Sequence, residues 1–152
     1  MKAGLRYGVE IRAALPADAA DVGLLLGQLG APMDARTAAA RLETLARTSD
    51  SPVLVATGYG PLAGLIALHW GSVLQHARPV ARITALVVDE GQRGAGIGRL
   101  LVKAGAQAAR SAGCDLLELA AGPRHALGFL RAIGFADDAV QLTRSLRKKP
   151  PS

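Results

Sequence analysis

Three glycines at alternate positions, Gly94, Gly96 and Gly98, stand between Arg93 and an apolar run in the stretch DEGQRGAGIGRLLVKAG (residues 89–105). Glycine has no Cβ atom and tolerates positive φ, so its backbone can approach a ligand closely. Where such a turn opens a helix, unpaired N–H groups and the positive end of the helix dipole attract an anion. The stretch is therefore suited to bind phosphate groups through main-chain donors.

Two phosphate-binding motifs do not fit this spacing. A Walker A loop requires a lysine followed by serine or threonine, and no such pair follows any glycine of the chain. A dinucleotide-binding fingerprint requires GxGxxG, and Arg99 occupies the position of the third glycine. Glu118 imitates the acidic residue that binds the ribose in that fingerprint, so the match to it is partial.

The pattern that fits is R-x-x-G-x-G, which covers Arg93, Gly94, Ala95, Gly96, Ile97 and Gly98. A second block, A-x-x-F-L-x-x-x-G-F, occupies residues 126–135 and contains Phe129. In this order the two blocks resemble those of the GCN5-related N-acetyltransferase (GNAT) superfamily, and the resemblance covers essentially the whole chain. It implies an α/β fold of the GNAT-like acyl-CoA N-acyltransferase type, a central mixed sheet flanked by about four helices.

The resemblance also implies acetyl-CoA as co-substrate and a primary amine, on a small molecule or a protein, as acceptor. The glycine loop would bind the diphosphate, Arg93 would cap its charge, and Arg99 or Lys103 would reach the 3′-phosphate. Phe129 would contribute to the coenzyme site. The pantetheine arm would lie along the preceding strand, where a backbone N–H near a bulge holds the thioester oxygen. By resemblance, that region is Leu86, Val87 and Val88.

Two positions depart from the family pattern. Leu130 stands where the second block usually carries a tyrosine that protonates the leaving thiolate, and an aliphatic side chain cannot donate a proton. Pro123 replaces an asparagine that usually contacts the coenzyme. These departures keep a second hypothesis open, an acyl-CoA-binding regulatory module with weak or no catalysis. Tyr7 and Tyr59 are the only tyrosines that could replace the acid.

Candidates for the general base are Glu118, in DLLELAA, and His69, in LIALHW. A buried carboxylate would hold a proton more readily and suit base work, while a histidine could accept a proton directly or through water. Both residues could equally have structural roles. Acids in the first two predicted helices could attract a cationic amine or simply complement the helix dipoles; they are Asp18, Asp21, Asp34 and Glu43.

The elements that must position these residues follow from periodicity and from turn residues. Strands are predicted at 9–15, 53–57, 65–70, 81–88, 115–121 and 139–146. Helices are predicted at 17–29, 34–47, from 97 onward and at 125–133. The glycine loop and its helix join two of the strands, so 81–88 and 115–121 should be parallel neighbours in a mixed sheet.

Composition limits the remaining function classes. With 152 residues, half of them hydrophobic, we expect a single domain over 1–147 and a short basic, proline-containing tail at 148–152. The net charge of +6 favours an anionic small molecule, because scattered arginines and 3% aromatic residues do not suit nucleic acid. One cysteine excludes a cysteine-based metal site, and we expect no metal, no membrane segment and a cytoplasmic location. The acceptor and homodimer formation stay open.

Overall fold

The computed structural model describes residues 8–120, 124–138 and 141–148. The chain forms two compact units, Met1–Leu119 and Ala120–Ser152. Organisation as one domain over 1–147 stays a prediction. Of the predicted tail at 148–152, only Lys148 lies within the described residues, and Pro123 and Tyr7 lie outside them.

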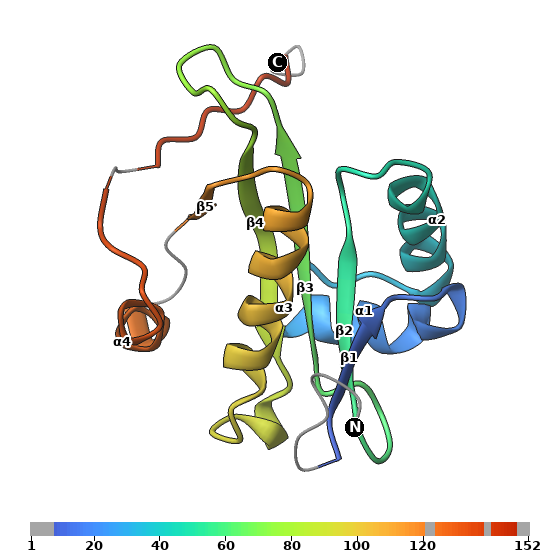
Figure 1. Ribbon diagram of the computed structural model, residues 1–152. Helices are drawn as coiled ribbons and strands as arrows, with labels where there is room; N and C mark the ends of the chain where they lie inside the picture. Colours follow the sequence, from blue (N-terminus) through green and yellow to red (C-terminus); the bar gives the residue numbers. More distant parts are fainter. Residues whose placement is uncertain (1–7, 121–123, 139–140, 149–152) are drawn as a thin grey trace. The chain divides into compact units, whose positions relative to one another are not determined.

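In its described part, the first unit contains a five-stranded sheet in the order β1-β2-β3-β4-β5 (Figure 1). Neighbours are antiparallel except β4 and β5, which are parallel, so the predicted mixed sheet and its parallel crossover are confirmed. The strands are β1 (Glu10–Ala13), β2 (Val53–Thr57), β3 (Gly64–Gly71), β4 (Val80–Val88) and β5 (Leu116–Leu119).

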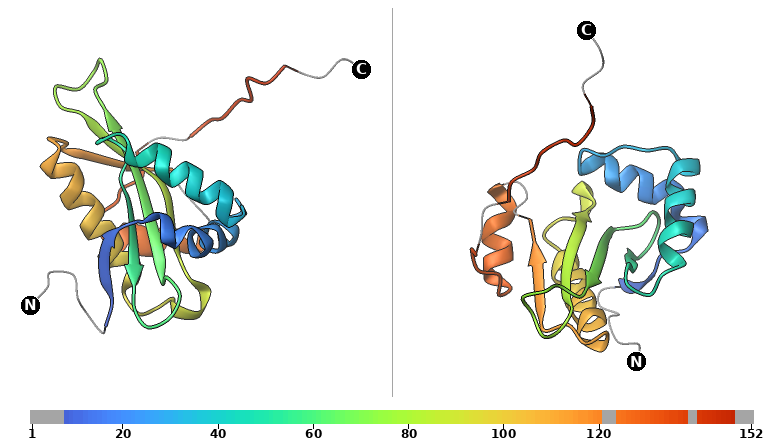
Figure 2. Two further views of the ribbon diagram at one scale, coloured as in Figure 1. Left: turned by 90° about the vertical axis from the view of Figure 1, so that its right-hand side faces the viewer. Right: turned by 90° about the horizontal axis from the view of Figure 1, so that it is seen from above.

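Helices cover both faces of this sheet (Figure 2). A short 3-10 helix, η1 (Pro16–Asp18), leads into α1 (Ala19–Gln28), and α2 (Ala35–Ala46) packs beside α1. The predicted helix 17–29 therefore begins as a 3-10 turn at a proline, whose missing N–H is tolerated there. The opposite face carries α3 (Ile97–Ser111), after the 3-10 helix η2 (Glu90–Gln92).

The core is divided by the sheet. On the α1 and α2 face, Leu25 and Leu42 pack with Val55, Leu65 and Val87 from three strands. On the α3 face, a Cβ atom at Gly105 would lie 3.0 Å from Ile66 Cδ1 and 3.2 Å from Leu68 Cδ1. The helix can approach β3 this closely because position 105 has no side chain.

The second unit contains α4 (Arg124–Ala132), which ends at Gly134 with φ of 106°. The predicted strand at 139–146 is wrong for residues 141–146, which adopt no regular secondary structure. Leu142 and Leu146 are 89% and 90% exposed. Alternating residues predict a strand only if a neighbouring strand pairs with it, and the sequence does not encode that partner. Residues 139 and 140 lie outside the described residues.

Candidate functional site

The glycine loop leaves the sheet at the end of β4 and enters α3. Gly94 and Gly96 have φ of 89° and 79°, and a Cβ atom built on either would meet nothing within 4 Å. Gly96 is the N-cap of α3, and no side chain caps the helix. The first-turn amides of a 15-residue helix thus face an open, exposed loop, as an anion site requires.

Four further predicted residues fix or flank this loop. Ile97 is 2% exposed and anchors the first turn of α3 in the core. The Arg93 Nε atom donates to the Val88 carbonyl oxygen at 3.3 Å, so its guanidinium group turns back toward β4. Ala95 and Arg99 are exposed on either side of the helix start, which leaves both accessible to a ligand.

A clamp from α1 holds the start of the loop. The Gln28 Nε2 atom donates to Asp89 Oδ1 at 2.9 Å, and Gln28 Oε1 accepts from the Glu90 N–H at 3.0 Å. Asp89 Oδ2 also accepts from the Gly91 N–H at 3.1 Å, and the Asp89 N–H donates to the Ala63 carbonyl oxygen. Sequence reasoning missed Gln28, because nothing in the local pattern joins residues 61 positions apart.

The strand before the loop is paired on one edge only near its end. β4 pairs with β5 over Val80–Ile83 alone, whereas its pairing with β3 continues to Val88. Ala85 is opposite Ala67 and Ile83 is opposite Leu68, so Thr84 is an extra residue on β4. The irregularity lies two positions before Leu86. In the described part of the chain, the β5-side edge of residues 84–88 has no strand partner.

The two candidate bases lie in one cross-strand row. His69 on β3 is opposite Arg82 on β4, which is opposite Glu118 on β5. Two strand spacings, about 10 Å, separate the histidine and glutamate backbones. Both side chains are exposed, so the burial that would favour Glu118 as a base is not present. The Nδ1 atom of His69 lies 2.8 Å from the Ser51 hydroxyl oxygen.

Acids in the first two helices all have partners within the fold. Asp18 binds Arg12 through both carboxylate oxygens, at 2.7 and 2.8 Å, and accepts from the Leu15 N–H. Asp34 caps α2 by accepting from the Thr37 N–H at 2.7 Å. The other two acids behave similarly: Asp21 accepts from the Leu62 N–H, and Glu43 pairs with Arg47. These contacts account for the acids without an acceptor amine.

Phe129 and Leu130 lie on α4, in the second unit. Leu130 is 6% exposed, as suits an aliphatic side chain. Tyr59, in the turn between β2 and β3, is 94% exposed.

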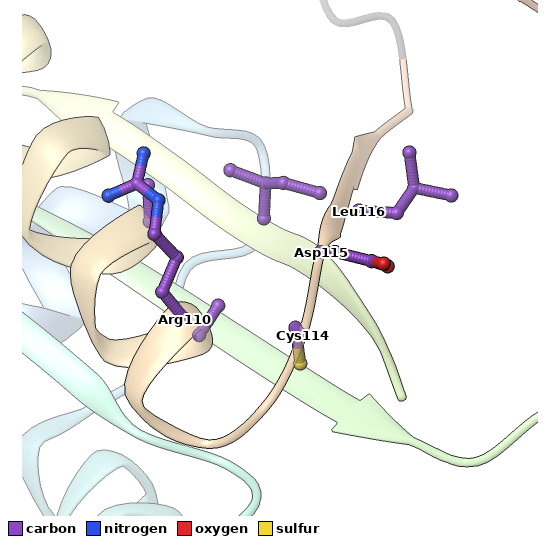
Figure 3. Close-up of a pocket in the computed structure, with 7 residues that line it drawn as sticks. Arg110, Cys114, Asp115 and Leu116 are labelled. Atoms are coloured by element: carbon purple, nitrogen blue, oxygen red, sulfur yellow. The ribbon is translucent and has the colours of Figure 1, made fainter. Parts of the chain in front are cut away.

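A pocket of about 340 Å³ lies at the other end of α3, between that helix and β5 (Figure 3). Arg110, Cys114, Asp115 and Leu116 line it, together with Ala106, Ala109 and Leu117. Burial raises the pKa of the Cys114 thiol, and the Asp115 charge adds to this effect. None of the predicted site residues lines this pocket. Among the described residues, no three His, Cys, Asp or Glu side chains gather as metal ligands, and no helix has the length and apolarity of a membrane span.

Comparison with known proteins adds independent findings. An acetyltransferase from Trypanosoma brucei is 27% identical, with a TM-score of 0.79 over 91% of this chain and 99% of its own. A protein from Arthrobacter sp. FB24 is 32% identical, with a TM-score of 0.75 over 90% of this chain and 96% of its own. Aminoglycoside N-acetyltransferase AAC(6′)-Iy, solved with CoA, is 17% identical with a TM-score of 0.78 over 91% and 95%, which shows a shared fold alone. No curated protein matches the sequence.

The sequence matches the acetyltransferase (GNAT) family over residues 29–135, a range that contains both the glycine loop and the second block. The mixed sheet with helices on both faces is the architecture that the solved acetyltransferases share. The predicted fold class and the resemblance are thereby confirmed, and the chain belongs to the GNAT family of acetyltransferases.

Proposed function

We propose that the protein is an acetyl-CoA-dependent N-acetyltransferase that acts by direct transfer to a primary amine of a small molecule or a protein. One observation carries this proposal: the half-paired end of β4 leads, through the short helix η2, into an open glycine loop at the N-terminus of α3. A strand edge and a helix N-terminus in sequence match the two parts of a coenzyme A arm, an amide-containing chain and a diphosphate.

The glycine loop fits the diphosphate. Space at Gly94 and Gly96 lets phosphate oxygens approach the amides of Ile97, Gly98 and Arg99, which no side chain caps. The helix dipole adds roughly half a positive charge at this point. Arg93, the C-cap of η2, precedes the N-cap Gly96 by three residues and supplies a full charge.

The end of β4 fits the pantetheine arm. Residues Leu86, Val87 and Val88 offer backbone N–H and C=O groups on the edge that β5 leaves unpaired. An arm with two amide groups can pair with that edge as an added strand. A backbone N–H beside the extra residue Thr84 would then hold the carbonyl oxygen of the thioester and stabilise the charge that develops on it.

The row of His69, Arg82 and Glu118 supports amine chemistry beside this edge. An acceptor amine is protonated near neutral pH and must lose a proton before it attacks. Both candidate bases are exposed. They lie in one cross-strand row that passes through Arg82 of β4, close to the extra residue Thr84.

A regulatory module that binds acyl-CoA is the second candidate. Leu130 favours it, because this buried aliphatic side chain cannot protonate the leaving thiolate. In the catalytic proposal the thiolate takes its proton from water. Release of thiol from acetyl-CoA, measured with polyamines, amino acids, aminoglycosides and peptides, separates the two candidates. Binding without thiol release for any amine would leave only the module.

The proposed diphosphate site in the glycine loop, here called the cradle, is tested by Gly96→Val. A side chain at this position would hold the phosphates away from the amides, and losing two hydrogen bonds to a charged group raises the Kd for acetyl-CoA by about 100-fold or more. Gly60→Val is the matched control, because Gly60 has φ of 90° and likewise nothing within 4 Å. Both variants carry the same type of backbone strain, as thermal melts would check. Equal acetyl-CoA affinities in calorimetry would contradict the cradle.

A further inference from the structure

A chain of hydrogen bonds ends at His69. The Ser51 hydroxyl donates to Asp50 Oδ1 at 3.0 Å, and its oxygen lies 2.8 Å from His69 Nδ1. Ser51 is 8% exposed, and among the described residues it is the only buried residue with a polar or charged side chain. The backbone holds this arrangement in register, because Trp70 N–H donates to the Asp50 carbonyl oxygen and Leu68 N–H to that of Pro52, each at 3.0 Å.

The protons of this chain determine the tautomer of His69. A hydroxyl group has one proton to donate, and an ionised carboxylate can only accept. Hydrogen bonds from the Thr48 and Ser51 hydroxyls hold the pKa of Asp50 below its usual value, so it is a carboxylate at neutral pH. Because the Ser51 hydroxyl donates its one proton in the hydrogen bond to Asp50, its oxygen can only accept from the histidine. The Nδ1 atom of His69 must therefore carry a proton. Nε2 then has a free lone pair.

The side chain of His69 lies on the sheet face that carries α1 and α2, the same face as Ala67 beside the irregularity of β4. Leu68 packs against Gly105 of α3, so His69, the next residue of the strand, points to the opposite face. Leu65, which faces α1 and α2, lies on the same side of β3 as Ala67 and His69. Ala67 is opposite Ala85 at the irregularity of β4, and its carbonyl oxygen accepts from Thr84 Oγ1 at 3.2 Å.

Along the strand, His69 is two residues from Ala67, about 7 Å. An imidazole at that spacing reaches an amine beside the irregularity directly or through one water molecule. The charged groups in the same row are Arg82 and Glu118, and Asp50 lies behind the ring through Ser51. In the described part of the chain, His69 Nε2 has no hydrogen-bond partner.

We propose that Asp50 and Ser51 are positioning residues that hold His69 in the Nδ1–H tautomer, and that Nε2 of His69 is the base that deprotonates the acceptor amine. This inference rests on the proposed acetyltransferase function and selects His69 over Glu118. Nε2 takes one proton from the ammonium group and passes it to solvent. The amine nitrogen then bonds to the acetyl carbon as the carbon–sulfur bond breaks, and the second proton lost from nitrogen is balanced by one that water gives to the thiolate.

The tautomer can be measured without any substrate. Nitrogen-15 NMR of the histidine side chains, with His76→Gln and His125→Gln for assignment, should show His69 protonated on Nδ1 in its neutral form. Ser51→Ala should convert it to a mixture with the Nε2–H form, and Ser51→Thr, which restores a hydroxyl, should return it. Wild-type protein with neutral His69 protonated on Nε2 would overturn the relay.

The catalytic role of His69 is tested by kcat/KM for the amine that reacts best among the polyamines, amino acids, aminoglycosides and peptides. His69→Gln should lower kcat/KM by about 100-fold or more, as expected for loss of a general base. Ser51→Ala should lower it by about 10-fold, since the forming imidazolium loses one charge-assisted hydrogen bond. Ser51→Thr should recover most of the rate. Ser72→Ala, an exposed serine after β3, is the control.

Calorimetry with acetyl-CoA distinguishes this inference from the proposed function. All these variants should bind acetyl-CoA with unchanged Kd, because none touches the glycine loop. Normal kcat/KM in His69→Gln, with acetyl transfer intact, would overturn the role of His69 alone. Absence of acetyl transfer by the wild-type protein to every amine would overturn the proposed function and the base together, whichever tautomer NMR reports.

Discussion

In the proposed coenzyme site, Arg99 and Lys103 carry charges that suit a second phosphate. Both are exposed on the first two turns of α3, one helical turn apart, beyond the amides proposed to bind the diphosphate. Neither has a hydrogen bond or ion pair to another described residue. Their charges are therefore available to a ligand at no cost to the fold.

Replacing Arg99 with glutamine should raise the Kd for acetyl-CoA by about 10-fold, the effect of losing one charge-assisted hydrogen bond. The Kd for 3′-dephospho-CoA should not change. Calorimetric Kd values for the two coenzymes make the comparison. Arg110→Gln, at the exposed far end of the same helix, is the control. Equal losses for both coenzymes would mean that Arg99 does not contact the 3′-phosphate.

Asp18 should make stability depend on pH. Hydrogen bonds from Arg12 and from the Leu15 N–H hold its pKa below the ordinary value of 3.8, against the opposing effect of burial. A carboxyl group with a depressed folded-state pKa stabilises the fold fully above its unfolded pKa, and that contribution is lost as the pH falls through the folded value. Asp18→Asn should cost about 1–3 kcal/mol at pH 6.

Urea denaturation of wild type and Asp18→Asn between pH 2 and 7 checks this sign. The difference in unfolding free energy should be constant above about pH 5 and shrink below about pH 4. Asp137→Asn breaks a pair with Arg131 whose side chains are 55% and 76% exposed, so it should change little at any pH. A difference that grows on acidification would refute the assignment.

Among single residues, those defined by local chemistry were predictable and those defined by distant partners were not. Asp34 is the first residue of the helix predicted at 34–47, and its carboxylate caps α2. Glu118 was suggested as a buried base from its apolar neighbours in sequence, yet it is exposed, because neighbours in a strand point to opposite faces. The Ser51–His69 contact spans 18 residues and depends on the register of β3.

At the scale of elements, the α1 clamp on the glycine loop predicts a binding effect without ligand contact. Gln28→Ala removes two hydrogen bonds that hold Asp89 and Glu90. The loop should then lose order, and the Kd for acetyl-CoA should rise by about 3- to 10-fold. Amide hydrogen exchange at Glu90 should accelerate in the same variant.

Gln107→Ala, on the exposed side of α3, is the matched control for this change. It removes a glutamine whose hydrogen bonds, to Ser111 and Arg110, are both 3.5 Å long. Unchanged exchange at Glu90 together with unchanged affinity in Gln28→Ala would show that η2 keeps its place without the clamp.

Elements themselves were predicted in proportion to how much of their pattern is local. The strand at 81–88, the helix that starts at Ile97 and the parallel crossover between β4 and β5 follow from a buried run, a glycine turn and the handedness of crossovers. The strand predicted at 139–146 had the right alternation, but residues 141–146 adopt no regular secondary structure. The extra residue at Thr84 leaves no trace in composition, because a bulge is a property of pairing.

At the scale of the whole molecule, Cys114 offers a measure of unfolding. It is 6% exposed, packs with Ala81 and Ala109, and its pKa is raised by burial. A buried, protonated thiol reacts only after the structure around it opens. Labelling by an aromatic disulfide should be slower than that of free cysteine by about 1,000-fold or more, and urea should accelerate it in step with loss of circular dichroism.

Rapid labelling of the folded protein would instead show that the turn between α3 and β5 opens by itself. Slow labelling has a practical value, because the thiol-release assays for acetyl transfer then have no background from the protein's only cysteine.

The unpaired end of β4 has a consequence for solubility. Among the described residues, no strand pairs with the β5-side edge of 84–88, and an edge proposed to receive a coenzyme can equally pair with a strand of another molecule, as edges do when sheet proteins aggregate. A second chain paired to residues 84–88 would occupy the place of the pantetheine arm. We therefore expect bound coenzyme to protect against aggregation. On heating, the apo protein should precipitate at a lower temperature than the protein with saturating CoA.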